Sequence, residues 1–126
     1  MPVSCPLCDR LPGGDCVEQN RHGCAFPDAF PVAPGHVLVI PRRHEPDLFA
    51  LTPEEQSDLW ALVRVVGHRL ADELRTRDFT VGANVGVAAG QTILHAHIHV
   101  IPRFPGDVPD PRGGIRWVIP SRAAYW

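Results

Sequence analysis

The stretch Gln91-Thr-Ile-Leu-His-Ala-His-Ile-His-Val-Ile-Pro-Arg103 carries histidines at every second position, His95, His97 and His99. A spacing of two is the period of a β-strand, in which successive side chains point to opposite faces. The pattern predicts a half-buried strand over residues 91–103, with the imidazoles on one face and small or branched apolar groups on the other. Side chains two positions apart on a strand are about 6.5–7 Å from each other. Neighbouring imidazoles can therefore share one substrate or one ion.

Three kinds of chemistry fit this histidine spacing. A neutral imidazole is a good nucleophile toward phosphorus at pH 7, and a second one can donate a hydrogen bond to a phosphate oxygen. A His-x-His pair can instead hold a catalytic metal ion that activates water. The third reading is a structural zinc site without catalysis. The spacing alone leaves all three open.

The composition indicates one globular domain without a polymeric or membrane partner. The chain has 126 residues, 44% of them hydrophobic, and a net charge of −2 from 12 basic and 14 acidic groups. That charge balance gives no reason to expect nucleic acid or a membrane surface as partner. Neither a run of membrane-span length nor a signal segment is present, so we expect a cytoplasmic protein.

The cysteines gather near the start of the chain, at Cys5, Cys8, Cys16 and Cys24. In a reducing compartment a disulfide framework is not expected, so Cys5-Pro-Leu-Cys8 predicts a metal knuckle. Two thiolates are only half of a tetrahedral site, and two more ligands must come from elsewhere. The Pro, Gly and Cys content of residues 1–13 predicts a loop.

The rest of the chain alternates strand patterns with one strong helix signal. Residues 15–19 and 22–26 have weak strand patterns, and 36–41 is a near-continuous apolar strand that ends at a proline. Thr52, Pro53 and Glu55 form the N-cap, first position and capping box of a helix expected to run to about Arg75.

After the helix we expect a strand over residues 79–85 and a loop of small side chains over 84–90. Small residues let a ligand approach backbone N–H groups closely. Residues 104–126 have no core pattern, so we expect an irregular tail rather than a second domain.

The histidine motif resembles the signature of the histidine triad (HIT) family, in which three histidines alternate with apolar residues. The resemblance extends over about 100 residues, in order and spacing. It covers Phe26-Pro-Asp28, the segment 34–41, the capped helix, Asn84 and Gly90-Gln91-Thr92. The tail over 106–117 resembles that of bacterial members described as dinucleoside polyphosphate hydrolases.

The resemblance implies an α+β fold in which residues 1–126 form a single domain. The sheet would be five-stranded and antiparallel, with one long helix and a short helix, a zinc-knuckle loop over 1–13 and an irregular tail over 104–126. It also implies a homodimer joined through the long helices and edge strands.

For the activity, the resemblance implies cleavage at the α-phosphorus of a purine nucleotide or dinucleotide through a nucleotidyl–histidine intermediate. By position, His97 would be the nucleophile, His99 would hydrogen-bond a phosphate oxygen or the leaving group, and His36 would support them. Asp28 would accept hydrogen bonds from the ribose hydroxyls, and Phe26 would lie near the purine. The phosphate contacts would come from Asn84, Gln91, Thr92 and the backbone of Gly90. Thr92 stands where many members have serine, and both supply a hydroxyl.

The resemblance also completes the metal knuckle. Bacterial members with Cys-x-x-Cys hold a zinc through a histidine after the Ile-Pro strand and the first histidine of the triad. Carried over by position, the structural zinc ligands are Cys5, Cys8, His44 and His95. No organic cofactor is implied. Cys16 and Cys24 would then be packing residues, and neither His22 nor His68 is expected to have a function.

Two alternatives to the covalent mechanism stay open from the sequence. The chain could be a purine-nucleotide-binding adaptor without turnover, or a hydrolase whose zinc activates water. The leaving group is open as well, because phosphoramidates, dinucleoside polyphosphates and nucleotide sugars share the same nucleotidyl half. We expect the tail to select among them.

Overall fold

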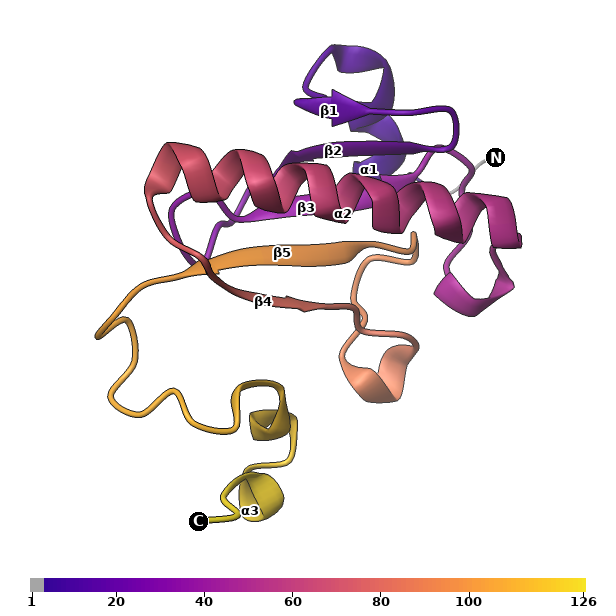
Figure 1. Cartoon of the computed structure of the whole chain (residues 1–126). Helices are drawn as coiled ribbons and strands as arrows, with labels where there is room; N and C mark the ends of the chain where they lie inside the picture. Colours follow the sequence, from indigo (N-terminus) through magenta and orange to yellow (C-terminus); the bar gives the residue numbers. More distant parts are fainter. Residues whose placement is uncertain (1–3) are drawn as a thin grey trace.

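A computed structural model describes residues 4–126. Its centre is a five-stranded antiparallel sheet in the order β1-β2-β3-β5-β4, with the long helix α2 lying across one face (Figure 1). This confirms the expected α+β fold class. The strands are β1 Glu18–Gln19, β2 Gly23–Pro27, β3 Val37–Pro41, β4 Asp78–Gly82 and β5 Ile98–Arg103. The α-helices are α1 Pro6–Arg10, α2 Pro53–Leu74 and α3 Pro120–Ala123, and the 3-10 turns are η1 Leu11–Gly13, η2 Leu48–Ala50, η3 Val87–Ala89 and η4 Gly114–Val118.

The start of α2 is fixed by the predicted capping box. The Thr52 hydroxyl accepts a hydrogen bond from the Glu55 amide, and the Glu55 carboxylate accepts one from the Thr52 amide. Arg43 adds a two-point contact with the same carboxylate, at 2.9 and 3.1 Å. The hydrogen bonds from Arg43, with those from Thr52, lower the pKa of Glu55 to about 2. The helix ends at Leu74, and the C-cap residue Arg75 has a left-handed φ of 55°.

Two apolar clusters cover the two faces of the sheet. On one face, Leu59, Leu62 and Val66 of α2 pack in one cluster with inward side chains of the strands. The other cluster joins β2 and β3 residues to Cys5 and Leu7 from the N-terminal segment. A fully buried side chain of this size contributes about 1.5–3 kcal/mol, so the apolar stripe of α2 is a large contributor to the first core. Because α2 takes one face, the histidine-bearing face is shaped by the N-terminal segment and the loops.

The prediction of one strand carrying three histidines is wrong for the first two. Strand β5 begins at Ile98, and of the three imidazoles only that of His99 lies on it. The reason is local hydrogen bonding: the Ala96 amide donates to the Glu45 carbonyl at 2.7 Å instead of continuing the ladder with β3. The backbone therefore bends at residues 93–95, before the strand begins. Ala96, Ile98 and Val100 still pack together in the cluster under α2, so the alternation of faces continues through residues 96–100.

The N-terminal segment is also more ordered than the predicted loop. From Pro6 to Gly13 it forms α1 and η1. Cys5 caps α1 by accepting the Cys8 amide on its sulfur at 3.3 Å, and proline occupies the first helical position, where a missing N–H costs nothing. The part of the predicted loop over residues 1–3 lies outside the described residues.

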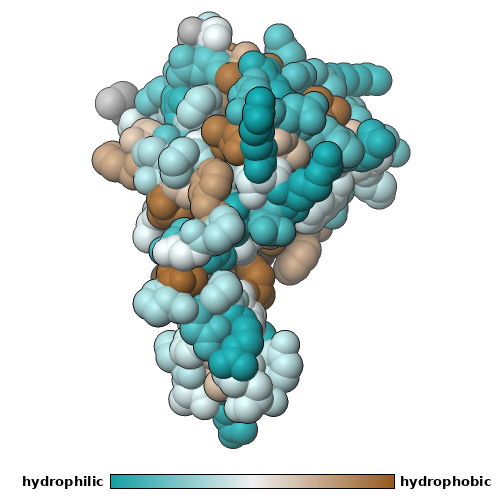
Figure 2. Space-filling model, turned by 60° about the vertical axis from the view of Figure 1, so that its left-hand side comes forward, coloured by the Kyte–Doolittle hydropathy of each residue, from teal (hydrophilic) through white to brown (hydrophobic). Residues whose placement is uncertain are grey.

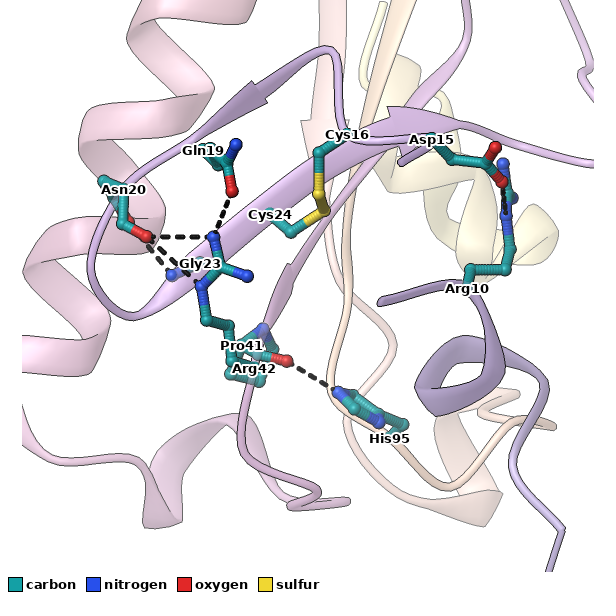
Figure 3. Close-up of a disulfide and its surroundings, with 10 residues drawn as sticks. All are labelled: Arg10, Asp15, Cys16, Gln19, Asn20, Gly23, Cys24, Pro41, Arg42 and His95. Carbon is teal, nitrogen blue, oxygen red and sulfur yellow. Dashed lines mark hydrogen bonds and ion pairs between the residues drawn. A yellow bond between two sulfur atoms is a disulfide. The ribbon is translucent and has the colours of Figure 1, made fainter. Parts of the chain in front are cut away.

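Cys16 and Cys24 form a disulfide, which corrects the expectation that they are packing residues without a bond (Figure 3). The β1–β2 register pairs Glu18 with Ala25 and brings the two cysteine Cα atoms to 5.7 Å, a usual separation for a disulfide. Cys24 is also fully buried in the second apolar cluster, so its packing role is confirmed. The β1–β2 register brings the two cysteines together, and a redox compartment says nothing about such a contact.

The C-terminal tail forms a small lobe beside β4 rather than a wholly irregular segment (Figure 1). The guanidinium of Arg116 donates to the carbonyls of Arg122 and Ala123, both at 2.8 Å, and closes η4 against α3. Ala123 is fully buried inside this lobe. Within residues 4–126, no helix has the length and apolar character needed to cross a bilayer.

The Arg43–Glu55–Thr52 contact predicts a measurable stability effect. Glu55→Ala removes the buried carboxylate of this ion pair and half of the capping box, so we expect the free energy of unfolding in urea to fall by about 1–3 kcal/mol. The matched control is Glu54→Ala at an exposed neighbouring position, with an expected change under about 0.5 kcal/mol.

The same pair predicts the pH dependence of that effect. Because the pKa of Glu55 falls from 4.5 to about 2 on folding, its contribution is complete above pH 4.5 and is lost as the pH falls through about 2. An equal deficit for Glu55→Ala at pH 7 and pH 2 would contradict this account.

Candidate active site

The catalytic candidates His36, His97 and His99 come together from two parts of the chain. His99 lies on β5, His36 directly precedes β3, and His97 lies at the turn before β5. Pairing of Leu38 with His99 brings β3 and β5 together at this point. The ring centroids of His36 and His97 are each 5.1 Å from that of His99.

The orientation of His97 leaves one ring nitrogen free to attack. Its Nδ1 donates a hydrogen bond to the carbonyl oxygen of His95 at 2.8 Å, and in the neutral ring this places the proton on Nδ1. The other nitrogen, Nε2, then carries a lone pair. His97 is 9% exposed, so the ring is held in a nearly closed environment. This is the geometry of a positioned imidazole nucleophile.

His36 and His99 form a directed hydrogen-bond chain. The Val32 amide donates to Nδ1 of His36 at 3.1 Å, so the proton of neutral His36 is on Nε2. That Nε2 lies 2.9 Å from Nδ1 of His99 and donates to it. Neutral His99 must then carry its own proton on Nε2. This chain of hydrogen bonds ends in one free N–H donor, His99 Nε2. Such a donor can stabilise a phosphate oxygen or protonate a leaving group.

Burial keeps these imidazoles uncharged. Desolvation lowers the pKa of His36, and the negative charge of Asp28 opposes that shift only in part. Desolvation also lowers the pKa of His99, helped by the neighbouring His97 and His36. Both pKa values thus lie below the usual 6.5, and at pH 7 both rings are neutral, as the hydrogen-bond chain requires.

Asp28 lies against the histidine chain. One carboxylate oxygen accepts the Phe30 amide at 2.8 Å, and the other lies 3.4 Å from Nε2 of His36 and 4.0 Å from Nδ1 of His99. Its side chain is 15% exposed. The carboxylate is thus adjacent to the reacting groups, and its second oxygen has capacity to accept hydrogen bonds from a ligand.

Phe26 is fully buried, and Arg10 covers its ring. The Arg10 guanidinium lies 4.0 Å from the ring centroid and is held by the Pro27 carbonyl and by Asp15. The Phe26 ring is therefore closed off from solvent, and the Arg10 guanidinium lies over it. Sequence reasoning missed Arg10, because only the folding of α1 brings it to this position.

The side chain of Gln91 holds the small-residue loop over residues 84–90 in place. Its amide accepts from the Gly86 N–H and donates to the carbonyls of Pro46 and Ile93, and the side chain is 5% exposed. Both amide donors are used, which argues against the expected direct phosphate contact. Gly86 and Gly90 have positive φ values of 92° and 95°, conformations that glycine adopts without strain.

The remaining loop residues are accessible. Asn84, Gly90 and Thr92 are exposed, and Asn84 lines a cavity that also reaches His36 and His99. These groups are free to meet a ligand. By contrast, His22 is bonded to Asp58 at 2.8 Å and His68 is exposed on α2, so neither belongs to the histidine cluster.

The four predicted metal ligands form a second cluster. The side-chain ligand atoms of Cys5, Cys8, His44 and His95 all lie within 4.8 Å of one another. Three of the sulfur-to-Nδ1 distances are 3.3, 3.3 and 3.5 Å. Zinc bonds of about 2.3 Å to sulfur and about 2.0 Å to nitrogen imply about 3.5 Å across a tetrahedron. The donor set and its spacing therefore fit zinc.

His95 is prepared for such a role by its second nitrogen. Nε2 donates to the Pro41 carbonyl at 2.8 Å, which leaves the Nδ1 lone pair directed at the sulfurs. Desolvation and the neighbouring Cys5 thiol raise the pKa of the Cys8 thiol to about 11. A thiolate at neutral pH here needs a cation beside it.

The HIT domain pattern matches residues 14–106 of this chain. The chain belongs to the histidine triad family. An uncharacterised HIT-like protein of Mycoplasma genitalium is 35% identical over 104 residues, which cover 80% of this chain and 74% of that protein. A Schizosaccharomyces pombe protein named bis(5'-nucleosyl)-tetraphosphatase (asymmetrical) is 40% identical over 75% of this chain, but the match spans only 52% of its length.

A solved HIT structure agrees with the fold of this chain. The crystal structure of a HIT family protein from Bacillus anthracis superposes with a TM-score of 0.76 at 36% identity. The superposition covers 82% of this chain and 76% of that protein. The histidine cluster therefore sits in a histidine triad fold.

The tautomers of the three histidines can be tested by long-range 1H–15N NMR at pH 7.5. We expect His97 as the Nδ1–H form, and His36 and His99 as Nε2–H forms, because each has a fixed donor or acceptor at the other nitrogen. Exposed His68 provides the control and should show averaged shifts. An Nε2–H form for His97 would remove the proposed nucleophile.

Proposed function

We propose that this histidine triad protein is a nucleotidyl hydrolase or transferase that works through a covalent nucleotide on His97. The observation that supports it most is the tautomer of His97, whose Nδ1–H is fixed on the His95 carbonyl while Nε2 keeps its lone pair. The Schizosaccharomyces pombe relative carries the name of a dinucleoside tetraphosphatase, which supports a nucleotide phosphate as substrate.

In the first step, Nε2 of His97 attacks the α-phosphorus and forms a P–N bond. The bond from phosphorus to the leaving group breaks, and the leaving atom takes the proton of His99 Nε2. In the second step water attacks the same phosphorus, the P–N bond breaks, and the nucleoside monophosphate is released. The proton lost by His99 is restored from that water. The hydrogen bonds from the Val32 amide to His36 and from His36 to His99 keep the His99 ring oriented during both steps.

The nucleoside would be held on the β2 side of the histidines. We propose that the free carboxylate oxygen of Asp28 accepts the ribose hydroxyls and that the base stacks on Arg10 above Phe26. Asn84, Thr92 and the Gly90 backbone would contact phosphate oxygens. Gln91 would hold their loop rather than touch the ligand.

We also propose that the Cys2His2 cluster holds a structural zinc, which would place the chain in the zinc-containing bacterial branch. With Cys5, Cys8, His44 and His95 all bound, a tetrahedral ion has no open position for water. This speaks against the zinc-activated-water alternative. The zinc would anchor α1, and with it Arg10, against the sheet.

A homodimer of single-domain chains remains part of the proposal. Strand β4 is at the edge of the sheet, and α2 exposes Trp60 at 48% and Val65 at 42%. Both features suit pairing with a second copy, as the family resemblance implies.

The nucleophile is tested by replacing His97 with Ala or Asn. We expect a fall in kcat of at least about 10³-fold on a nucleoside phosphoramidate or dinucleoside polyphosphate, because no other free imidazole lone pair is placed at the site. The matched control is His68→Ala, with activity within about 2-fold of wild type. Circular dichroism and thermal unfolding check that both variants are folded. Retained turnover in His97→Asn would reject the covalent mechanism.

The zinc is tested separately by metal analysis of purified protein. We expect one zinc per chain, its loss in Cys8→Ser and in the exposed His44→Ala, and full retention in His97→Ala. Equal metal content in His44→Ala and wild type would show that the four side chains do not act as one site.

A further inference from the structure

The Cys16–Cys24 disulfide lies beside the region proposed for the nucleoside base. Cys24 and Phe26 are two positions apart on β2, so their side chains point to the same face of the sheet. Both are fully buried in one apolar cluster, and Cys16 packs against that cluster from the segment before β1. The disulfide therefore joins the segment before β1 to the strand that carries Phe26.

The same segment carries Asp15, the ion-pair partner of Arg10. Asp15 directly precedes Cys16, and its carboxylate accepts a hydrogen bond from Nε of Arg10 at 3.1 Å (Figure 3). The Arg10 guanidinium in turn lies 4.0 Å from the centroid of the Phe26 ring and donates to the Pro27 carbonyl at 2.8 Å. The disulfide, the ion pair and the cation–π contact are thus connected in one series.

The disulfide is the closest anchor of Asp15. Within residues 4–126, no hydrogen bond reaches the backbone of Asp15 or Cys16. Pairing with β2 begins at Val17, whose amide donates to the Ala25 carbonyl and whose carbonyl accepts from Arg69, both at 2.8 Å. Reduction of the disulfide therefore leaves β1 paired and releases the two residues before Val17. The Asp15 side chain is 50% exposed, so its ion pair alone is too weak to hold the segment.

A soluble reductant can reach the disulfide from the Cys16 side. Cys16 is half-buried between the exposed Asp15 and Val17, whereas Cys24 is fully buried. The end of the molecule that carries α1 and β1 lies opposite the protruding tail lobe, so the tail does not cover it (Figures 1 and 2). In a reducing compartment, which the sequence leads us to expect, disulfides are usually transient and redox-sensing.

We propose that the Cys16–Cys24 bond is a redox switch for nucleoside affinity. Its reduction releases Asp15, and with it the fixed position of Arg10. This inference rests on the proposed function. A thiolate of a dithiol reductant attacks the Cys16 sulfur and forms a mixed disulfide, and Cys24 leaves as a thiolate that takes a proton. The second thiol of the reductant then closes the reductant's own disulfide and releases Cys16 as a thiol, so two electrons and two protons pass to the cysteines.

The oxidised form is the one prepared for the base. With Asp15 fixed, Arg10 is held over Phe26 before any ligand binds, and no binding energy is needed to order it. In the reduced form the Pro27 carbonyl still holds one end of the guanidinium, so only part of this order is lost. The histidine cluster is built on β3, β5 and the segment before β5, and it keeps its contacts. We therefore expect the nucleotide affinity, and not kcat, to depend on the disulfide.

The first test measures adenosine 5'-monophosphate binding to the full chain by calorimetry, with the protein oxidised and after reduction by dithiothreitol. We expect Kd to rise by about 3- to 10-fold on reduction, the effect of having to order one long side chain. Cys16→Ser, which cannot form the bond, should bind like reduced wild type and should not respond to dithiothreitol. Thermal unfolding and metal content check that every form keeps its fold and its N-terminal cluster.

The route through the ion pair is tested with Asp15→Ala. This variant should bind the nucleotide like reduced wild type in both redox states, because the two changes remove the same constraint and their effects do not add. The matched control is Asp72→Ala, which removes an exposed aspartate of α2 and should keep the full response to reduction. A full response in Asp15→Ala would overturn the route through Arg10.

Thermodynamic linkage supplies a readout that does not depend on turnover. If the oxidised form binds the nucleotide more tightly, saturating nucleotide must make the disulfide harder to reduce by the same factor. We expect the ratio of reduced to oxidised dithiothreitol at half-reduction, followed by alkylation of Cys16, to rise by about 3- to 10-fold when adenosine monophosphate is present. An unchanged ratio would overturn the switch.

The remaining outcomes separate this inference from the proposed function. Equal or tighter nucleotide binding after reduction, or free thiols at Cys16 and Cys24 in air-oxidised protein, overturns the switch and leaves the covalent mechanism standing. Absence of nucleotide binding in both redox states also overturns the switch. If turnover of a dinucleoside polyphosphate or phosphoramidate is absent as well, the proposed function falls with it.

Discussion

The hydrogen bond from His97 Nδ1 to the carbonyl oxygen of His95 is the interaction on which the site depends. It fixes the ring orientation and the tautomer of the candidate nucleophile together. The acceptor is itself held in place, because the His95 imidazole is fully buried, donates to the Pro41 carbonyl and lies among the cysteine sulfurs. One residue therefore serves the metal-ligand cluster with its side chain and the nucleophile with its backbone.

The histidines thus fall into two neighbouring clusters, and we propose a separate chemistry for each. The Cys2His2 set is closed and suits an ion that anchors the N-terminal segment. The chain of hydrogen bonds from the Val32 amide through His36 to His99 presents one N–H donor beside the free nitrogen of His97. The second arrangement depends on the β3–β5 pairing, which sets His36 against His99. The sheet thereby positions the donor, and the N-terminal segment positions the residues around the nucleoside region through Arg10.

Much of this arrangement could be predicted from the sequence, where local signals are strong. The capping box at Thr52 predicted the start of α2 at Pro53, where the structure has it. The family resemblance paired Cys5 and Cys8 with His44 and His95, and the structure brings these four together. Features that depend on long-range register were not predictable in the same way. The period of two suggested one strand, but the Ala96 amide bonds to Glu45 and the strand begins later.

The missed features share that cause. The Cys16–Cys24 disulfide follows from the β1–β2 register, and the contact of Arg10 with Phe26 follows from the folding of α1. The placement of Ile115 against Gly82 likewise needs the path of the tail, for which the sequence carries no periodic signal. Each joins residues whose spacing in the chain says nothing of their distance in space.

The central claim is that His97 alone among the clustered histidines forms the covalent bond to the nucleotide. Rapid quenching during turnover at alkaline pH, followed by tandem mass spectrometry of the peptide spanning residues 78–103, locates that bond directly. The account predicts the nucleotidyl mass on His97 and none on His95 or His99. A nucleotidyl group on His99, or turnover without any adduct in the quenched protein, would contradict it.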